Sequence, residues 1–387
     1  MPPTSTPWLT APDDSAALAW VGGLRRGKQA VVTLRATRAT GVGSLPGTDV
    51  AEWCRIVAGE LPELPHLPEL PGRGPGADMI GRTLGMLNAV SPDFAATTTP
   101  TGWRISSRLS GSPRALRRSQ SWLAEDLDAA EATWREHAGQ FKIQLAGPIT
   151  MAAVVESANG ERLLADSGAC RDLADALAHA AAEQVASAAR RLPLASLIVQ
   201  VDEPGLPAVL AGAVPVQSGW GRHNPLAESA AQTAIARVIA SITGASASSN
   251  NGAGAGAGAA VHCCAPDVPV GLLVAAGAGT VSLDLTLPQR DEELGGLLES
   301  GARLMAGLEL SPSDAGSIVS PNHVRPAAAP LLALLNRLGL SAQTLASQLV
   351  ITPRCGLAGV SAAAARHQYE LAAIVARAVE EFGERHG

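Results

Sequence analysis

The stretch Leu197-Ile-Val-Gln-Val-Asp-Glu-Pro204 is a short, nearly continuous apolar run that ends in two carboxylates and a proline. A run of this length without regular polar alternation is typical of a strand buried on both faces of a parallel sheet. Similar runs recur at residues 259–264, 280–285, 304–310 and 349–352, and each is followed by a helix-like segment such as 291–299 or 325–338. The sequence therefore predicts an α/β fold with a parallel sheet.

About eight strand–helix units over some 350 residues fit a (β/α)8 barrel. The expected organisation is a variable lead-in at 1–33 and a single barrel at 34–387. An open, doubly wound sheet is the alternative architecture. Nucleotide-binding versions of that fold are disfavoured, because no Gly-x-Gly-x-x-Gly follows the first strand and no Walker sequence is present.

Composition excludes several classes of function. The 387 residues carry a net charge of −6, so no basic face is expected for nucleic acid or anionic lipid. No apolar run is long enough to cross a bilayer, and the N-terminal residues lack the basic-then-apolar order of a secretory signal. Five cysteines without framework spacing predict a reduced, cytoplasmic protein.

Residues 244–260 form a low-complexity stretch of Ala, Gly, Ser and Asn. Such a stretch has little side chain to pack, so we expect a flexible surface loop there. An insertion tolerated in a surface connection is the simpler interpretation. A lid over the site is the alternative, because the stretch leads directly into His262.

The run at 259–264 ends in Val-His262-Cys263-Cys264, and Cys355 follows the run at 349–352. On a strand His262 and Cys264 face the same side, while Cys263 points away. A remote Cys at another strand end can complete a zinc site, and Asp284 at the end of its own apolar run is the candidate fourth ligand. Alternatively, the cysteines are small core residues.

Two further features lie at predicted strand ends. Asp202 and Glu203 are costly to bury unless they are paired or functional, although Asp202 could instead cap a helix that starts near Pro204. The turn Gly41-Val-Gly-Ser-Leu-Pro46 precedes a helix and could present backbone N–H groups to an anion.

Taken in order, these pieces resemble the catalytic, C-terminal half of cobalamin-independent methionine synthase. The matching stretches are Gly41-Val-Gly-Ser-Leu-Pro46, Ala146-Gly-Pro-Ile-Thr150, Gln200-Val-Asp-Glu-Pro204, His262-Cys-Cys264, Val281-Ser-Leu-Asp284 and Pro353-Arg-Cys-Gly-Leu357. The likeness covers roughly residues 38–384 and leaves no room for the second barrel of the full-length enzymes. It implies a core-type enzyme with the (β/α)8 fold shared with uroporphyrinogen decarboxylase, in which zinc activates the thiol of homocysteine.

The resemblance also implies roles for single residues. His262, Cys264 and Cys355 match zinc ligands, and Asp284 falls where the family usually has a ligating Glu. Val42, Gly43 and Ser44 match the turn that holds homocysteine. Asp202 matches the carboxylate that meets the homocysteine amine.

The departures from the family concern mainly the methyl donor. Val154 stands where the family has a folate-stacking Trp, and Ala208 where it has a folate-contacting Glu. Arg73 stands where a second carboxylate near the amine is expected. His323 is the nearest candidate for the family's proton-donating His, outside its usual local motif.

The sequence therefore predicts a zinc-dependent methyltransferase that converts homocysteine to methionine. Its expected partners are a small thiol and a methyl donor, which is either a methyl-corrinoid, free or on a corrinoid protein, or methyltetrahydrofolate. One alternative is corrinoid-dependent methylation of another thiol, since Arg73 suits an anionic group better than an ammonium. The other is a non-catalytic barrel that binds an amino acid or a metal.

Overall fold

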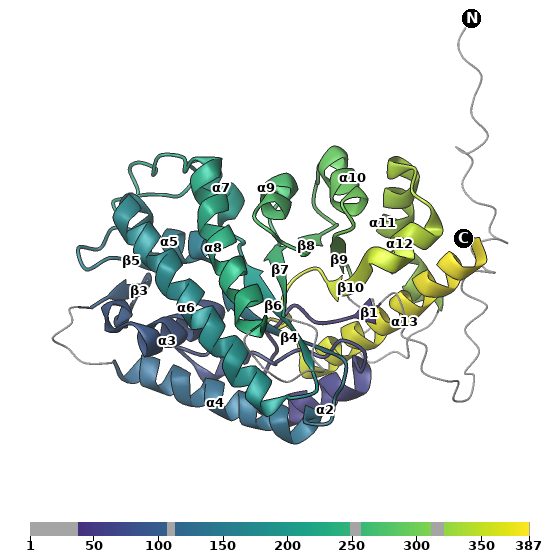
Figure 1. Cartoon of the computed structure of the whole chain (residues 1–387), viewed down its shortest axis with the longest axis horizontal. Coiled ribbons are helices and arrows are strands. Elements are labelled where there is room, and N and C mark those ends of the chain that lie inside the picture. The colour runs from purple at the N-terminus through teal and green to yellow at the C-terminus, as the bar shows by residue number, and fades with distance from the viewer. Residues whose placement is uncertain (1–37, 107–112, 248–256, 311–320, 387) are drawn as a thin grey trace, which may run out of the picture.

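Within the residues that the computed structural model describes (38–106, 113–247, 257–310 and 321–386), seven parallel strands form one central sheet (Figure 1). The strands are β1 (Arg38–Ala39), β4 (Gln140–Ala146), β6 (Ser196–Asp202), β7 (Gly258–Cys263), β8 (Thr280–Asp284), β9 (Arg303–Leu308) and β10 (Leu349–Pro353). Their order in the sheet is β1-β10-β9-β8-β7-β6-β4. The predicted parallel sheet is confirmed.

An irregular segment, residues 65–69, links the two edges of this sheet. On one side Lys142 N donates to Pro65 O at 2.9 Å and Leu67 N donates to Lys142 O at 2.8 Å. On the other side Leu45 N donates to Glu69 O at 2.8 Å, which ties the segment to the chain just after β1. The sheet is therefore curled, in the manner of a TIM barrel.

Prolines explain why this linking segment is not a regular strand. They occur at positions 62, 65, 68 and 71, every third residue of the segment and its flanks. Each proline lacks an N–H group and so cannot donate to a sheet ladder. The segment pairs through isolated bridges instead, Ser44 with Glu69 and His66 with Lys142.

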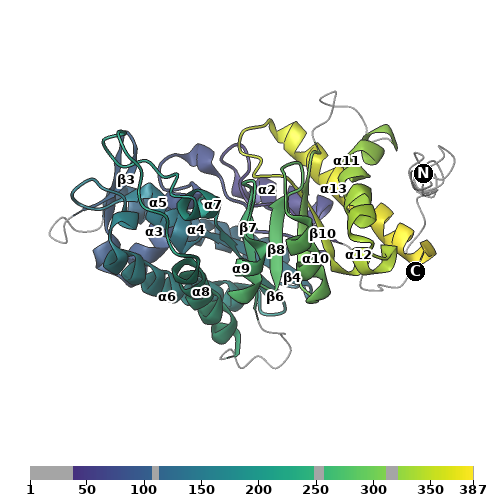
Figure 2. The ribbon, with the colours of Figure 1, turned by 90° about the horizontal axis from the view of Figure 1, so that it is seen from above.

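Helices flank the sheet on its outer side (Figures 1 and 2). They are α2 (Val50–Glu60), α3 (Met79–Val90), α4 (Arg114–Trp134), α5 (Pro148–Val154), α6 (Ser167–Arg191), α7 (Leu206–Leu210), α8 (Glu228–Ala247), α9 (Val270–Ala275), α10 (Asp291–Glu299), α11 (Pro321–Leu338), α12 (Ala342–Gln348) and α13 (Ala362–His386). A small second sheet joins β2 (Ala96–Thr99), β3 (Gly102–Ile105) and β5 (Val155–Glu156).

Several helices begin at an aspartate that accepts hydrogen bonds from free backbone N–H groups. Asp49 precedes α2 and accepts from Glu52 N, and Asp78 precedes α3 and accepts from Ile80 N and Gly81 N. Asp166 does the same for α6, which therefore begins at Ser167. These caps satisfy donors that a helix leaves unpaired in its first turn.

The expected loop at 244–260 is shorter in the structure. Helix α8 continues to Ala247, and β7 already begins at Gly258. Residues 248–256 lie outside the described part of the chain, as does the lead-in at 1–33. Alanine is the best helix former, which explains why the alanines at the start of this stretch extend α8.

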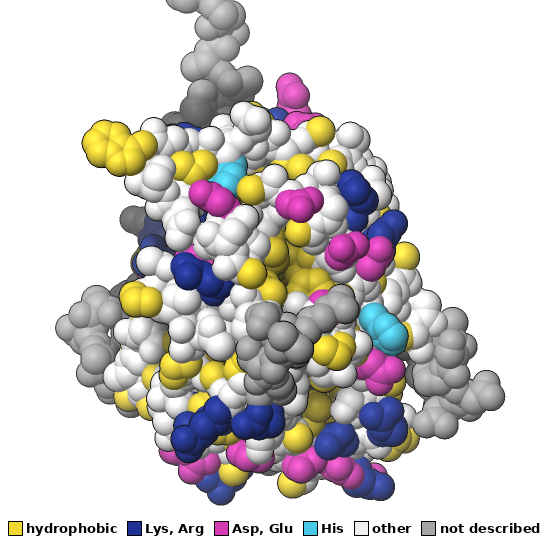
Figure 3. Space-filling model, turned by 90° about the vertical axis from the view of Figure 1, so that its left-hand side faces the viewer, with side chains coloured by type: hydrophobic (Ala, Val, Ile, Leu, Met, Phe, Trp, Pro, Cys, Tyr) yellow, Lys and Arg dark blue, Asp and Glu magenta, His cyan; other side chains and the backbone are white. Residues whose placement is uncertain are grey.

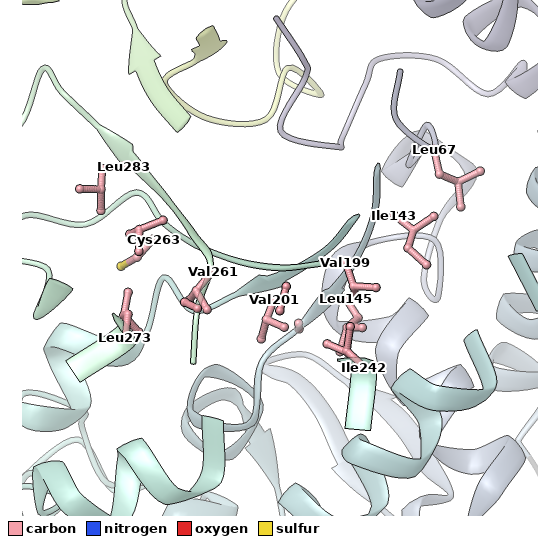
Figure 4. Close-up of a cluster of buried hydrophobic side chains, with 14 of the residues drawn as sticks. Leu67, Ile143, Leu145, Val199, Val201, Ile242, Val261, Cys263, Leu273 and Leu283 are labelled. Carbon is pink, nitrogen blue, oxygen red and sulfur yellow. The ribbon is translucent and has the colours of Figure 1, made fainter. Parts of the chain in front are cut away.

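The main hydrophobic core lies between the sheet and the helices (Figure 4). Cys263 belongs to this layer, together with Leu273 of α9 and Leu283 of β8. It therefore points away from the interior of the curled sheet, as predicted. A small second cluster, Leu64, Ile198, Ala260, Met305 and Val350, forms a separate buried group.

A buried hydrogen bond joins the linking segment to the C-terminal helix. Nε2 of His66 lies 2.8 Å from the hydroxyl oxygen of Tyr369 on α13, and both side chains are fully buried. Gly41 permits this contact, because a Cβ at that position would lie 2.3 Å from each of the two bonded atoms. The bond fixes α13 against the edge of the sheet.

Replacing Tyr369 by phenylalanine should lower the free energy of unfolding by about 1–3 kcal/mol, because His66 then keeps a buried polar atom without its partner. Chemical denaturation of the two proteins measures the change. Glu183→Gln, at an exposed position in the middle of α6, serves as control and should change stability by less than about 0.5 kcal/mol. A Tyr369→Phe protein as stable as the wild type would contradict this role.

His66 should also make the fold sensitive to acid. Burial lowers the pKa of His66 to about 3, from an ordinary value of 6.5. Between these pH values the unfolded chain binds a proton that the folded chain does not. Stability contributed by His66 is therefore present above pH 6.5 and lost as pH falls, by up to about 1.4 kcal/mol per pH unit. Between pH 7 and 4, the free energy of unfolding should fall less steeply with decreasing pH in His66→Gln than in the wild type, as measured by chemical denaturation.

Candidate functional site

His262, Cys264 and Cys355 meet where β7 and β10 end. The Sγ atoms of Cys264 and Cys355 are 3.7 Å apart, and Cys355 is also hydrogen-bonded to His262. Nδ1 of His262 lies 2.9 Å from Oγ of Ser282 on β8, which leaves Nε2 for the cysteines. The structure thus brings together three residues that the sequence predicted to converge.

The two thiols of this trio have unequal proton affinities. The hydrogen bond between the two sulfurs, together with His262, lowers the pKa of Cys355. The same bond, added to burial, raises the pKa of Cys264. Cys355 is exposed while His262 is buried. Cys355 is therefore the member of the pair that loses its proton more readily, and it is also the one that a cation or a substrate can reach.

The trio fits zinc in donor type and in sulfur spacing. Two thiolates on one tetrahedral zinc, each at about 2.3 Å, stand about 3.8 Å apart. Ser282 holds the remote nitrogen of His262, as outer-sphere partners of ligating histidines commonly do. No group of three or more His, Cys, Asp or Glu in the described residues already surrounds a common point. Side-chain rotation is therefore needed before the trio can bind a metal.

Asp284, the predicted fourth ligand, lies at the end of β8, two residues after Ser282. One of its oxygens, Oδ1, accepts from the backbone N–H of Thr286 at 2.9 Å and from its hydroxyl at 2.6 Å. Asp284 therefore stabilises the turn that follows β8. A role in metal binding requires its second oxygen.

The turn Val42–Ser44 lies beside the trio. Leu357, two residues after Cys355, donates its N–H to the carbonyl of Ser44 at 2.7 Å. Gly356 packs so closely that a Cβ there would lie 2.0 Å from Oγ of Ser44. The predicted substrate turn and the predicted metal end therefore belong to one site.

Asp202 is buried at the end of β6, in register with His262 on β7. Its Oδ1 accepts from Nε2 of Gln200 at 2.7 Å. Burial raises the pKa of Asp202 above its ordinary value. The helix-cap interpretation of Asp202 is wrong, because the next helix, α7, starts after Gly205 without a side-chain cap.

The neighbouring carboxylate, Glu203, has a structural role. Its Oε1 accepts from Ile149 N at 2.9 Å, and its Oε2 accepts from both the N–H and the hydroxyl of Thr150 at 2.7 Å. Gly147 is required beside it, since a Cβ there would lie 2.3 Å from Oε1. Glu203 thus ties the start of α5 to the end of β6.

Glu69 is a carboxylate at this site that the sequence prediction missed. It is only 5% exposed, and burial raises its pKa to about 8. The charge of Arg82 opposes this shift, while the charge of Asp202 adds to it, so the two carboxylates interact. Glu69 is the last residue of the proline-rich segment 65–69. The prolines interrupt the apolar run from which a strand is predicted.

Arg73 and His323 have other neighbours in the structure. The Arg73 guanidinium pairs with Asp126 of α4 at 2.7 Å and donates to the Thr48 carbonyl at 3.1 Å. The ring of His323, in the first turn of α11, packs edge-on against His367 of α13 at a centroid distance of 5.8 Å. Arg73 therefore pairs with Asp126, and Glu69 is the acidic group that interacts with Asp202.

The two positions expected to contact a folate lie on short helices. Val154 is the last residue of α5, and Ala208 lies exposed in α7. Neither offers an aromatic face or a carboxylate. Contacts to a bound folate would therefore have to come from other residues.

Surface charge is mixed rather than segregated. On the face shown in Figure 3, Lys and Arg side chains lie beside Asp and Glu, particularly along its lower edge. This agrees with the net charge of −6. Among the described residues, no helix combines the length and the hydropathy needed to traverse a bilayer.

Comparison with known proteins finds similarity at the level of structure. No protein-family model matches the chain, and no curated protein matches it. Among solved structures the chain is similar to a B12-independent methionine synthase from Shewanella sp. W3-18-1 in complex with selenomethionine. The identity is 16%, the alignment covers 67% of each chain, and the TM-score is 0.43. At this low level of similarity, the function has to be inferred from the residues of the site itself.

Proposed function

We propose that the chain is a zinc-dependent methyltransferase that methylates the thiol of homocysteine to give methionine. Its fold is then a (β/α)8 barrel in which the segment 65–69 takes the place of one strand. One observation carries the proposal: His262, Cys264 and Cys355 adjoin the buried carboxylate Asp202. A soft-metal site beside a carboxylate suits a ligand that carries both a thiol and an ammonium.

The metal end would use His262, Cys264 and Cys355, with Asp284 as a further ligand through its second oxygen. Zinc bound there would lower the pKa of a coordinated substrate thiol, so that its sulfur is nucleophilic at neutral pH. Nitrogen and sulfur donors suit zinc better than magnesium or calcium. Ser282 would keep the ring of His262 in its ligating orientation.

The amino-acid end would use Asp202 and Glu69 for the ammonium and the turn Val42–Ser44 for the carboxylate. Burial raises the pKa of both groups. An incoming ammonium would favour their charged forms and would interact with them with little screening by solvent. Holding the amino acid at these two points would orient its sulfur toward the methyl donor. His323 remains a candidate proton donor on the basis of the family resemblance alone.

The methyl donor is proposed to be a methyl-corrinoid, delivered free or on a partner protein. Val154 and Ala208 support this choice, because neither supplies the stacking or carboxylate contact that a folate donor uses in the resembling family. Methyltetrahydrofolate is the competing donor.

A paired-donor assay tests the proposal. Zinc-loaded protein is incubated with homocysteine and either methylcobalamin or methyltetrahydrofolate, and methionine is quantified. We expect methionine from methylcobalamin. Mercaptoethanesulfonate, a thiol without an ammonium, should be methylated far more slowly, because it lacks the group that Asp202 and Glu69 would bind. Methionine from the folate alone would overturn the proposed donor, and no methionine from either donor would overturn the proposed reaction.

A further inference from the structure

Lys142 is a lysine buried in a chain that has only two lysines among its 29 basic residues. It lies on β4 and is 0% exposed. Its Nζ donates to the carbonyl of Val42 at 2.8 Å and to Oε1 of Gln200 at 2.7 Å. A buried amine is costly unless it is hydrogen-bonded, and burial lowers the pKa of Lys142 to about 7. The two acceptors, with the nearby acidic groups Asp202 and Glu69, compensate part of that cost.

Gln200 continues the network toward Asp202. Its Nε2 donates to the carbonyl of Val42 at 2.9 Å and to Oδ1 of Asp202 at 2.7 Å. Every polar atom of the Gln200 amide therefore has a partner. The Val42 carbonyl accepts two bonds, one from Lys142 and one from Gln200.

The partners of Gln200 fix which way its amide faces. The carbonyl of Val42 and the carboxylate of Asp202 are acceptors, so the amide nitrogen turns to them and the amide oxygen turns to Nζ of Lys142. Lys142 satisfies this oxygen and also bonds the Val42 carbonyl, so it holds both ends of the link between the turn and Gln200. It does so from outside the metal trio.

We propose that Lys142, acting through Gln200, is a positioning residue that sets the spacing between the Val42–Ser44 turn and Asp202. The inference rests on the proposed function, in which these two points hold the carboxylate and the ammonium of one amino acid. Lys142 does not itself touch the substrate. By fixing this spacing, Lys142 makes the site selective for a ligand that carries both a carboxylate and an ammonium.

Ligand binding to Lys142→Met and Gln200→Leu proteins tests this role, with zinc content and thermal stability measured alongside. The ligands are L-homocysteine and 4-mercaptobutanoate, which is homocysteine without its amine, each titrated calorimetrically into zinc-loaded protein. Each variant should bind homocysteine at least about tenfold more weakly, the equivalent of one lost hydrogen bond to a charged group. Affinity for 4-mercaptobutanoate should stay within about threefold, because that ligand does not span the two points.

Thr352→Val is the matched control. Thr352 lies buried on β10, and its hydroxyl has no hydrogen-bond partner among the described residues. This variant should bind both thiols like the wild type. Because Lys142 and Gln200 act in one network, the double variant should bind homocysteine no more weakly than the weaker-binding of the two single variants.

Two results would overturn the inference. Equal losses for both thiols would indicate general damage to the site, and unchanged homocysteine binding would show that the network is dispensable. If Lys142→Met does not fold, Gln200→Leu carries the same expectation. Failure of the proposed function is distinguishable, because the wild-type protein would then bind neither thiol in a zinc-dependent manner.

Discussion

A Cys355→Ser protein should retain well below one zinc ion per chain and lose thiol methylation by more than about 100-fold. Changes in residues that merely support a metal ligand commonly cost 10–100-fold, so loss of a ligand should cost more. Cys355 is the exposed member of the trio, and its sulfur lies 3.7 Å from that of Cys264. Elemental analysis and the methylcobalamin assay measure the two effects.

Cys263→Ala is the control for this experiment. Cys263 is adjacent to Cys264 in sequence but lies in the hydrophobic layer outside the sheet (Figure 4). It should keep full zinc content, with some loss of stability from the smaller side chain. Stoichiometric zinc in the Cys355→Ser protein would contradict the proposed ligand set.

An Asp202→Asn protein should show kcat/KM for homocysteine reduced by about 100- to 1,000-fold, with zinc content unchanged. Asparagine keeps an oxygen for the bond from Gln200 but removes the charge that would meet the ammonium. Removing one partner of a buried charged pair costs about 3–5 kcal/mol, of which the interaction with Glu69 would recover a part. Steady-state kinetics with homocysteine measure the loss.

The same variant should react with 4-mercaptobutanoate at nearly the wild-type rate, because that thiol has no ammonium to lose. A similar loss for both thiols would mean that Asp202 serves the metal end through its neighbour His262. A wild-type kcat/KM for homocysteine would exclude Asp202 from substrate binding.

Apolar strands and their ends could be predicted from the sequence because both faces of a parallel sheet are buried. The predicted runs at 259–264, 280–285 and 349–352 correspond to β7, β8 and β10 within one residue. Parallel strands bring their carboxyl ends together, so the convergence of His262 and Cys355 followed from the strand assignments. The closeness of Cys264 and Cys355 was therefore predictable.

Residues outside regular strands could not be predicted in this way. The segment 65–69 has prolines where a strand would have N–H donors, so Glu69 was missed and Arg73 was assigned in its place. The bonds from Thr286 to one oxygen of Asp284 could not be predicted from the sequence either, and they leave the second oxygen for the predicted metal role. Glu203 and Asp202 are adjacent and chemically alike, and only their partners separate a structural carboxylate from one in the site.

Zinc held by His262, Cys264 and Cys355 should deprotonate the thiol of a bound amino acid. The protons released on homocysteine binding can be measured by calorimetry at pH 7 in buffers of different ionisation enthalpy. A free thiol is mostly protonated at this pH, so zinc-loaded protein should release about one proton per site. Zinc-free protein and Cys355→Ser should release none. Homocysteine binding without proton release, or with the same release in the absence of zinc, would contradict the account.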